Sequence, residues 1–131
     1  MTDRPYDTSW DDDNGDIKAF ERKSRQWKSR NWIAWLKKKL MFPFEAERME
    51  DDLDPFAPND VKSRNPFFVG CKVQVLGIAD EDCDVEFEGV IMEVRDRKRK
   101  GYIPLQDMEV FPKSDPNYWP VREFVVWYAN Q

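Results

Sequence analysis

Polar and apolar residues alternate in the stretch Lys72-Val73-Gln74-Val75, which begins two residues after Gly70. Alternation with a period of two places successive side chains on opposite faces of a β-strand. After an acidic connection at 79–84, apolar residues return over 85–95, and we expect them to form one long strand. A polar turn and two further short apolar stretches follow, up to Val110. Short strands separated by polar turns are typical of a small SH3-like β-barrel.

Toward the N-terminus the pattern is helical. Residues 17–40 contain neither Pro nor Gly, and most of their apolar residues recur at spacings of three, four and seven. This spacing predicts an amphipathic helix with Asp16 as its cap, divided near 29–31 and ended before Pro43. The apolar residues that we expect to face the barrel are Trp27, Trp32, Trp35 and Leu36.

The C-terminal residues are rich in aromatic and aliphatic side chains, which must pack against a core. We interpret 120–128 as a helix, although a strand fits the same pattern. The predicted fold is therefore α+β, with an N-terminal helix or helix pair packed on the barrel and an aromatic segment closing the core. The predicted organisation is a mobile acidic tail (1–15) and a single domain (16–131), which divides into a helical part (16–42), an acidic loop (43–67), the barrel (68–112) and a closing segment (113–131).

Composition excludes several chemistries. The 131-residue chain has no histidine and two cysteines, Cys71 and Cys83. Catalytic triads with a histidine base, histidine-ligated zinc and sites that need four thiolates are excluded. No Gly-rich phosphate-binding loop is present either, and we do not expect an enzyme. Because the sequence has neither a membrane-length apolar run nor a signal-peptide start, we expect a cytoplasmic protein with free thiols.

Charge is distributed unevenly. The formal net charge is −5, but residues 16–42 hold nine basic residues against only Asp16 and Glu21. This segment carries +7 and the remainder −12. Either the two parts compensate each other within the fold, or each faces a different partner. A basic helix with Trp could meet nucleic acid or an anionic membrane, but the acidic remainder would repel phosphate, so we expect no nucleic-acid partner.

Carboxylates are densest in the connection that follows the first predicted strand. Ca²⁺ takes about 6–8 oxygen ligands, and a loop can bend so that successive carboxylates converge on one ion. This stretch is therefore the first candidate calcium site. The alternative is a solvated acidic turn that deters edge-to-edge strand pairing. The acidic residues are Asp80, Glu81, Asp82, Asp84, Glu86 and Glu88.

A second acidic group begins at Glu45 and Glu47 and continues through 50–54. It could supply ligands from a second loop, or it could be a solvated linker. Residues 12–21 fit part of an EF-hand loop, but Trp10 stands at the first ligand position, so we do not expect an EF-hand.

Several motifs follow one another in a characteristic order: Phe42-Pro43-Phe44-Glu45-Ala46-Glu47, Val69-Gly70-Cys71-Lys72-Val73-Gln74-Val75, the acidic stretch with Cys83, Ile103-Pro104-Leu105-Gln106-Asp107-Met108-Glu109, and Val125-Val126-Trp127-Tyr128. In order and spacing this series, over residues 31–128, resembles the cyanobacterial-type calcium-binding protein family.

The resemblance implies a small bacterial protein that binds Ca²⁺ through acidic residues and is not an EF-hand. It also implies a helical N-terminal part packed on a small β-barrel. We therefore expect a monomeric calcium buffer or sensor. The alternative is a metal-free protein–protein interaction module that uses the barrel surface and the basic helix. The acidic residues at matching places, and thus the candidate ligands, are Glu45, Glu47, Asp80, Glu81, Asp82 and Asp84.

Overall fold

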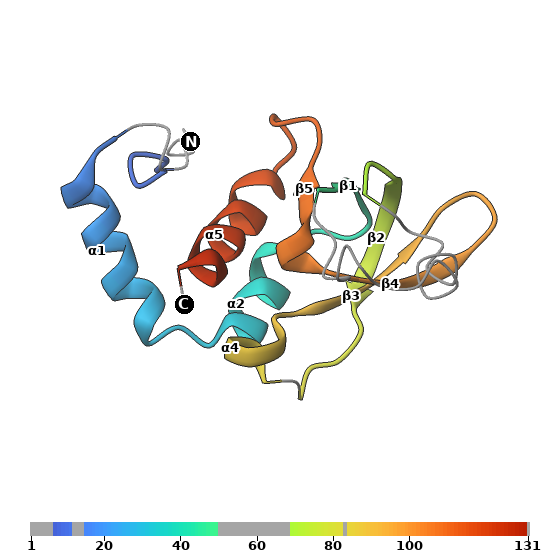
Figure 1. The fold of residues 1–131 in the computed structure, drawn as a ribbon, viewed down its shortest axis with the longest axis horizontal. Helices are drawn as coiled ribbons and strands as arrows, with labels where there is room; N and C mark the ends of the chain where they lie inside the picture. The colour runs from blue at the N-terminus through green and yellow to red at the C-terminus, as the bar shows by residue number, and fades with distance from the viewer. Residues whose placement is uncertain (1–6, 12–14, 50–68, 83, 131) are drawn as a thin grey trace, which may run out of the picture.

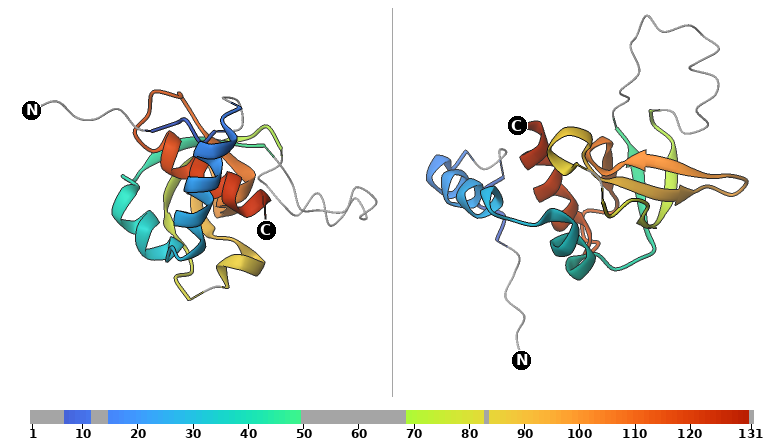
Figure 2. Two further views of the ribbon diagram at one scale, coloured as in Figure 1. Left: turned by 90° about the vertical axis from the view of Figure 1, so that its left-hand side faces the viewer. Right: turned by 90° about the horizontal axis from the view of Figure 1, so that it is seen from below.

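A computed structural model describes residues 7–11, 15–49, 69–82 and 84–130. The helices α1, α2 and α5 gather at one end of a β-sheet, and the β3–β4 hairpin projects from the other end (Figures 1 and 2). In chain order the elements are α1 (Ile17–Lys28), α2 (Trp32–Lys39), β1 (Phe44–Arg48), β2 (Lys72–Ile78), α4 (Val85–Glu88), β3 (Ile91–Arg95), β4 (Lys100–Pro104), the 3₁₀ helix η2 (Leu105–Asp107), β5 (Met108–Val110) and α5 (Tyr118–Ala129).

The strands form one antiparallel sheet in the order β4-β3-β2-β1-β5. The α+β class is confirmed, but the SH3-like barrel is not, because within the described ranges no ladder joins β4 to β5 and the sheet stays open. β4 ends at Pro104, which has no N–H to donate, and passes directly into η2. α5 packs against both η2 and β5. Contacts of α5 with η2 and β5, rather than a strand ladder, therefore cover the gap between the two edge strands β4 and β5.

The prediction of one long strand over 85–95 is wrong. Residues 85–88 form the short helix α4, and β3 begins only at Ile91. Gly89 separates the two elements with φ 73° and ψ −154°, a backbone conformation that is essentially restricted to glycine. Carboxylates in the first turn, Glu86 among them, suit the positive end of a helix dipole. Gly89, the C-cap residue, thus ends a short helix where the apolar pattern favoured a continuous strand.

The predicted division of the N-terminal helical segment is confirmed. The Asp16 carboxylate accepts a hydrogen bond from the Ala19 N–H (3.0 Å), and the Asn31 side chain accepts one from the Ala34 N–H (3.2 Å). Each cap satisfies a donor that the first turn of a helix leaves unpaired, so Asn31 starts a second helix. The C-terminal segment is the helix α5, as expected. Among the described residues, no helix is both long and apolar enough to cross a membrane.

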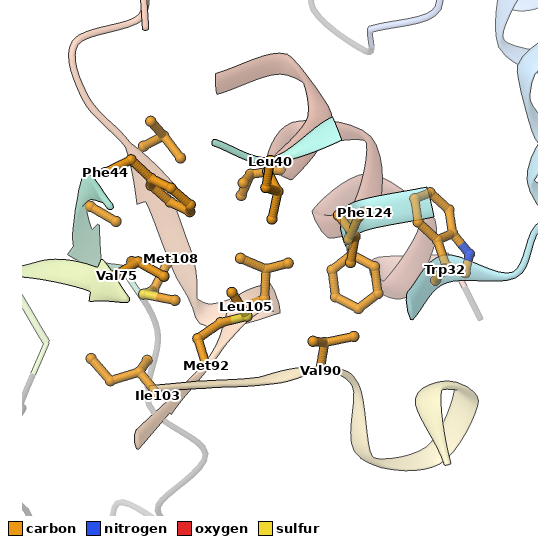
Figure 3. Packing of buried hydrophobic residues seen from close by; sticks show 14 of the residues in the cluster. Trp32, Leu40, Phe44, Val75, Val90, Met92, Ile103, Leu105, Met108 and Phe124 are labelled. Atoms are coloured by element: carbon orange, nitrogen blue, oxygen red, sulfur yellow. The ribbon is translucent and has the colours of Figure 1, made fainter. Parts of the chain in front are cut away.

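The hydrophobic core lies where α2 and α5 meet the sheet (Figure 3). Phe124 of α5 is fully buried, and its ring centroid lies 5.4 Å from that of Trp32 on α2. Of the helix residues predicted to face the sheet, Trp27, Trp32 and Leu36 are buried and Trp35 is partly buried. Buried residues of the sheet and its connections include Val75, Val90, Met92, Val94, Ile103 and Leu105.

Residues 7–11, which belong to the stretch 1–15 predicted to be a mobile acidic tail, pack against the domain. Trp10 is 1% exposed, and its ring meets the rings of Trp27 and Trp119 edge to face. Asp11 forms an ion pair with Arg122 of α5 (3.1 Å). Burial of this large indole stabilises the contact between the short segment and the domain. Residues 1–6 and 12–14 of the predicted tail lie outside the described residues.

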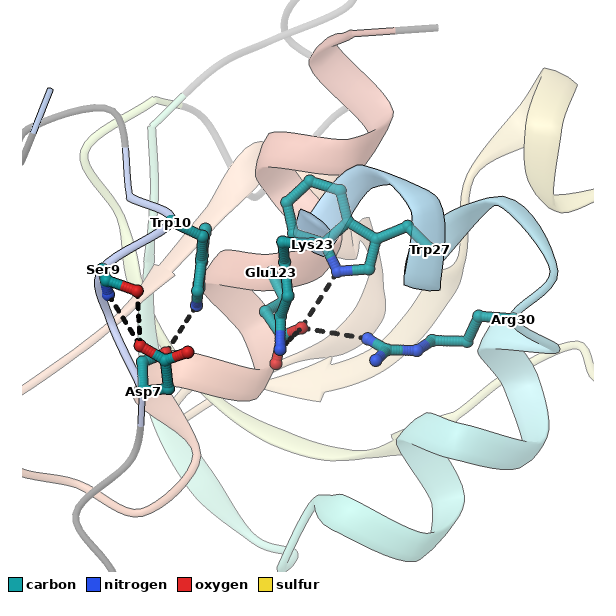
Figure 4. A network of polar contacts seen from close by, with 7 residues as sticks. All are labelled: Asp7, Ser9, Trp10, Lys23, Trp27, Arg30 and Glu123. Atoms are coloured by element: carbon teal, nitrogen blue, oxygen red, sulfur yellow. Dashed lines mark hydrogen bonds and ion pairs between the residues drawn. The ribbon is translucent and has the colours of Figure 1, made fainter. Parts of the chain in front are cut away.

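A buried carboxylate joins α1 to α5 (Figure 4). One oxygen of Glu123, Oε1, accepts from Trp27 Nε1 (2.9 Å) and contacts the Lys23 ammonium (2.9 Å) and the Arg30 guanidinium (3.0 Å). The other oxygen, Oε2, is buried without a hydrogen-bond partner. Burial raises the pKa of Glu123 to about 8 and lowers the pKa of Arg30 to about 10. The helical part of the molecule is thus held by polar contacts around Glu123 that are largely shielded from water.

Gly89→Ala should destabilise the protein by at least about 2 kcal/mol, because the backbone conformation costs ~1–3 kcal/mol for any other residue. The added methyl would also overlap the side-chain amide of Gln106, which hydrogen-bonds to the Glu88 carbonyl and the Val90 N–H. Gly77→Ala is the matched control, since a methyl there meets no heavy atom within 4 Å. Equal urea-unfolding midpoints for the two variants would contradict this account of α4.

Glu123 should make stability pH-dependent. Its pKa is about 8 in the folded protein against an ordinary value of 4.5, so between these values the folded state holds a proton that the unfolded chain releases. The stability that this group contributes is fully present below the lower value and is lost as pH rises through the higher one. We expect the free energy of unfolding to fall as pH rises from about 5 to 9, and to fall less in Glu123→Gln. Identical slopes in urea titrations of both proteins would show that another group is responsible.

Candidate metal site

The candidate carboxylates Asp80, Glu81, Asp82 and Asp84 lie in the loop that joins β2 to α4 (Figure 1). All four residues are exposed. The Asp80 carboxylate accepts a hydrogen bond from the backbone N–H of Asp82 (3.0 Å), which bends the loop into a tight turn. Asp84 is the N-cap residue of α4, but its side chain makes no capping hydrogen bond. Its oxygens are therefore not committed to the helix.

The far end of this acidic stretch is fixed to the body of the protein. Gln106 of η2 donates to the Glu88 carbonyl (3.0 Å), and the Tyr128 hydroxyl of α5 donates to the Phe87 carbonyl (3.2 Å). Glu86 and Glu88 are exposed on α4, as is the Phe87 ring, at 83%. The loop thus runs between two anchored elements, β2 and α4, while its carboxylates face solvent.

One cation of the basic helical segment reaches this loop. The Lys37 ammonium of α2 forms an ion pair with the Glu81 carboxylate. Two other cations of the segment, Lys23 and Arg30, pair with Glu123. The Lys37–Glu81 pair therefore compensates part of the +7 charge of the segment within the fold, which was one of the two alternatives left open by the sequence.

The structure does not bring Glu45 and Glu47 to the loop. Both lie on β1, where Glu45 pairs in register with Gln74 of β2 and Glu47 pairs with Lys72. The loop leaves β2 after Ile78, which at about 3.3 Å per residue is ~13 Å beyond Gln74 along the strand. Oxygens that share one Ca²⁺ lie within about 2.6 Å of it. The two candidate groups therefore cannot hold the same ion in this arrangement.

The donors suit Ca²⁺ in kind, since they are exposed hard oxygens. In the described part of the chain, however, no three carboxylate or cysteine side chains are gathered closely enough to hold a metal ion. The loop carboxylates would have to draw together around an ion. The remaining acidic residues of the second group, at 50–54, lie outside the described residues.

Sequence reasoning missed a charged row on the sheet. The register of the ladders sets Glu109 of β5 opposite Glu47, with Lys72 on the other side of Glu47. The Tyr118 hydroxyl donates to Glu109 (3.3 Å). The alternation in Met108-Glu109-Val110 is a signal that could have indicated an outward carboxylate, but only the pairing of distant strands reveals its neighbours. Because Lys72 lies beside Glu47, the negative charge of the row is already partly neutralised.

Comparisons with known proteins identify a family. Residues 20–128 match the model of the CcbP family, which is described as calcium binding. Curated proteins give no match. Among solved structures, the chain is similar to the crystal structure of CcbP from Anabaena, with a TM-score of 0.56 and 19% sequence identity. The similarity covers 98% of this chain and 96% of that chain. At this identity the likeness shows that the two share a fold.

Proposed function

Since the chain belongs to the CcbP family of calcium-binding proteins, we propose that it binds Ca²⁺ through the carboxylates of the β2–α4 loop, as a small calcium buffer or sensor. The observation that carries this proposal is the match of the family model over residues 20–128, which include the whole loop. The family is defined by calcium binding and not by an enzymatic activity. We also propose that the protein is a monomer and that it is cytoplasmic; the free thiol of Cys71 is in keeping with the second of these proposals.

The proposed ligands are Asp80, Glu81, Asp82 and Asp84. Four carboxylates supply four to eight oxygens, according to whether each binds through one oxygen or two, and exposed positions leave room for water to complete the shell. The hydrogen bond from the Asp82 N–H to the Asp80 carboxylate already folds the backbone between two of the four residues into a turn. Glu45 and Glu47 stand apart on β1, so we assign them no part in this ion site.

The choice between buffer and sensor depends on how much the loop moves. Gathering the carboxylates around an ion would pull on Asp84, the residue that begins α4. If this changes the exposure of α4, the protein can report calcium to a partner, whereas a loop that closes without moving α4 would only store the ion. Hydrogen exchange of residues 85–88 with and without Ca²⁺ separates the two roles.

The double substitution Asp80→Asn and Asp82→Asn should weaken calcium binding at least tenfold, which corresponds to about 1.4 kcal/mol. Asparagine keeps the size of each side chain but removes two charges from the ion site. The matched control is Glu45→Gln with Glu47→Gln, which removes the same charge from β1 and should change affinity much less. Calorimetric titration of metal-stripped proteins measures both. A larger loss of calcium affinity in the β1 variant would contradict the loop site and indicate that the ion binds at β1.

Calcium should also raise the melting temperature selectively. A ligand that binds only the folded state stabilises it by about 2.7 kcal/mol at a hundredfold excess over Kd, which is several degrees for a domain of this size. Mg²⁺ should do less, because it demands octahedral geometry and sheds water reluctantly. Sodium chloride at matched ionic strength controls for screening. Equal shifts with all three salts would mean a general response to counterions, and would favour the metal-free interaction module.

A further inference from the structure

We propose that Lys37 of α2 is a built-in competitor for the calcium loop: its ammonium group holds Glu81 in the metal-free protein and must leave when Ca²⁺ binds. This inference rests on the function proposed above and concerns how the affinity of that same site is set. The observation behind it is the ion pair between the Lys37 ammonium and the Glu81 carboxylate, across two elements distant in the sequence.

The position of Lys37 is fixed by the core. On α2, Trp32 is 4% exposed and Leu36 is fully buried, and Asn31 caps the start of the helix. Because two side chains on one face of α2 are buried, the helix cannot rotate freely about its axis. The direction in which each of its other side chains leaves the helix is therefore set. Lys37 directly follows Leu36, so the core determines where its side chain leaves the helix surface. The packed helix α2 therefore holds the backbone of Lys37 at a place from which its ammonium group reaches Glu81.

The neighbouring lysines are directed elsewhere. Successive residues of an α-helix are turned by about 100°, so Lys38 and Lys39 leave α2 in other directions than Lys37. Both are exposed, and among the described residues it is Lys37 that forms an ion pair with the loop. The helix thus supplies one cation that pairs with the loop, next to two chemically identical ones for which no ion pair with the described loop residues is found.

The ion pair contributes little to folding stability. The side chains of Lys37 and Glu81 are 56% and 53% exposed, and exposed pairs of this kind are weak because water and salt screen them. Its effect on calcium binding is larger, since a divalent ion in the loop is repelled by an ammonium a few ångströms away and needs the same carboxylate. Breaking the pair therefore alters affinity more than it alters stability.

The test is calorimetric calcium titration of three metal-stripped proteins: wild type, Lys37→Gln and Lys38→Gln. We expect Lys37→Gln to bind Ca²⁺ about three- to tenfold more tightly than wild type, because one repelling charge close to the ion is gone. Lys37→Arg, which keeps the charge, should bind as wild type does. At about 0.1 M salt the Debye length is ~10 Å, so salt should weaken the effect of an unpaired charge more than that of the charge in contact with the loop, and Lys38→Gln should change affinity less than Lys37→Gln.

Three outcomes would overturn the proposal. Equal gains in Lys37→Gln and Lys38→Gln would mean that only net charge matters, and a weaker affinity in Lys37→Gln would mean that Lys37 positions a ligand. In both cases calcium binding itself would stand. Absence of binding in wild type would instead remove the proposed function along with this inference. A circular-dichroism melt of each variant without calcium checks that the fold is intact.

Discussion

Phe124 lies fully buried between the helices and the sheet, and the placement of the candidate site depends on this packing. On one side its ring meets Trp32 of α2. On the other side it faces Val90 (Figure 3), the buried residue between Gly89 and the start of β3. α2 carries Lys37, and Gly89 ends the acidic helix α4. The packing of Phe124 therefore helps to position both α2, which carries Lys37, and the end of the acidic stretch that contains Glu81.

The basic segment makes two kinds of charged contact, one buried and one at the surface. Lys23 and Arg30 are drawn inward to the buried carboxylate of Glu123, where they attach α1 to α5. Lys37 is at the surface, paired with an exposed carboxylate that a metal ion can also use. The same basic segment thus has a structural role at one end and, in our proposal, a regulatory role at the other. Burial decides between the two, because a buried ion pair is costly to break and an exposed one is not.

The sequence predicts what depends on local pattern. Asp16 and the break at Asn31 could be read from capping chemistry, and β2 from the alternation of Val73 and Val75. The sequence could not predict that Gly89 would end a helix, since the residues before it also fit a strand. Nor could it show that β1 carries Glu45 away from the loop, because strand register depends on pairing between distant segments. The contact between Lys37 and Glu81 is of the same kind.

Binding of Ca²⁺ at the β2–α4 loop is tested most directly by a heteronuclear NMR titration of the backbone amides. We predict that the amide resonances of residues 79–88 shift on calcium addition in a saturable manner, that Lys37 responds with them, and that residues 45–47 do not. Saturable shifts centred on β1, or shifts at the loop that grow without saturation and are equal with Na⁺, would contradict binding at this loop.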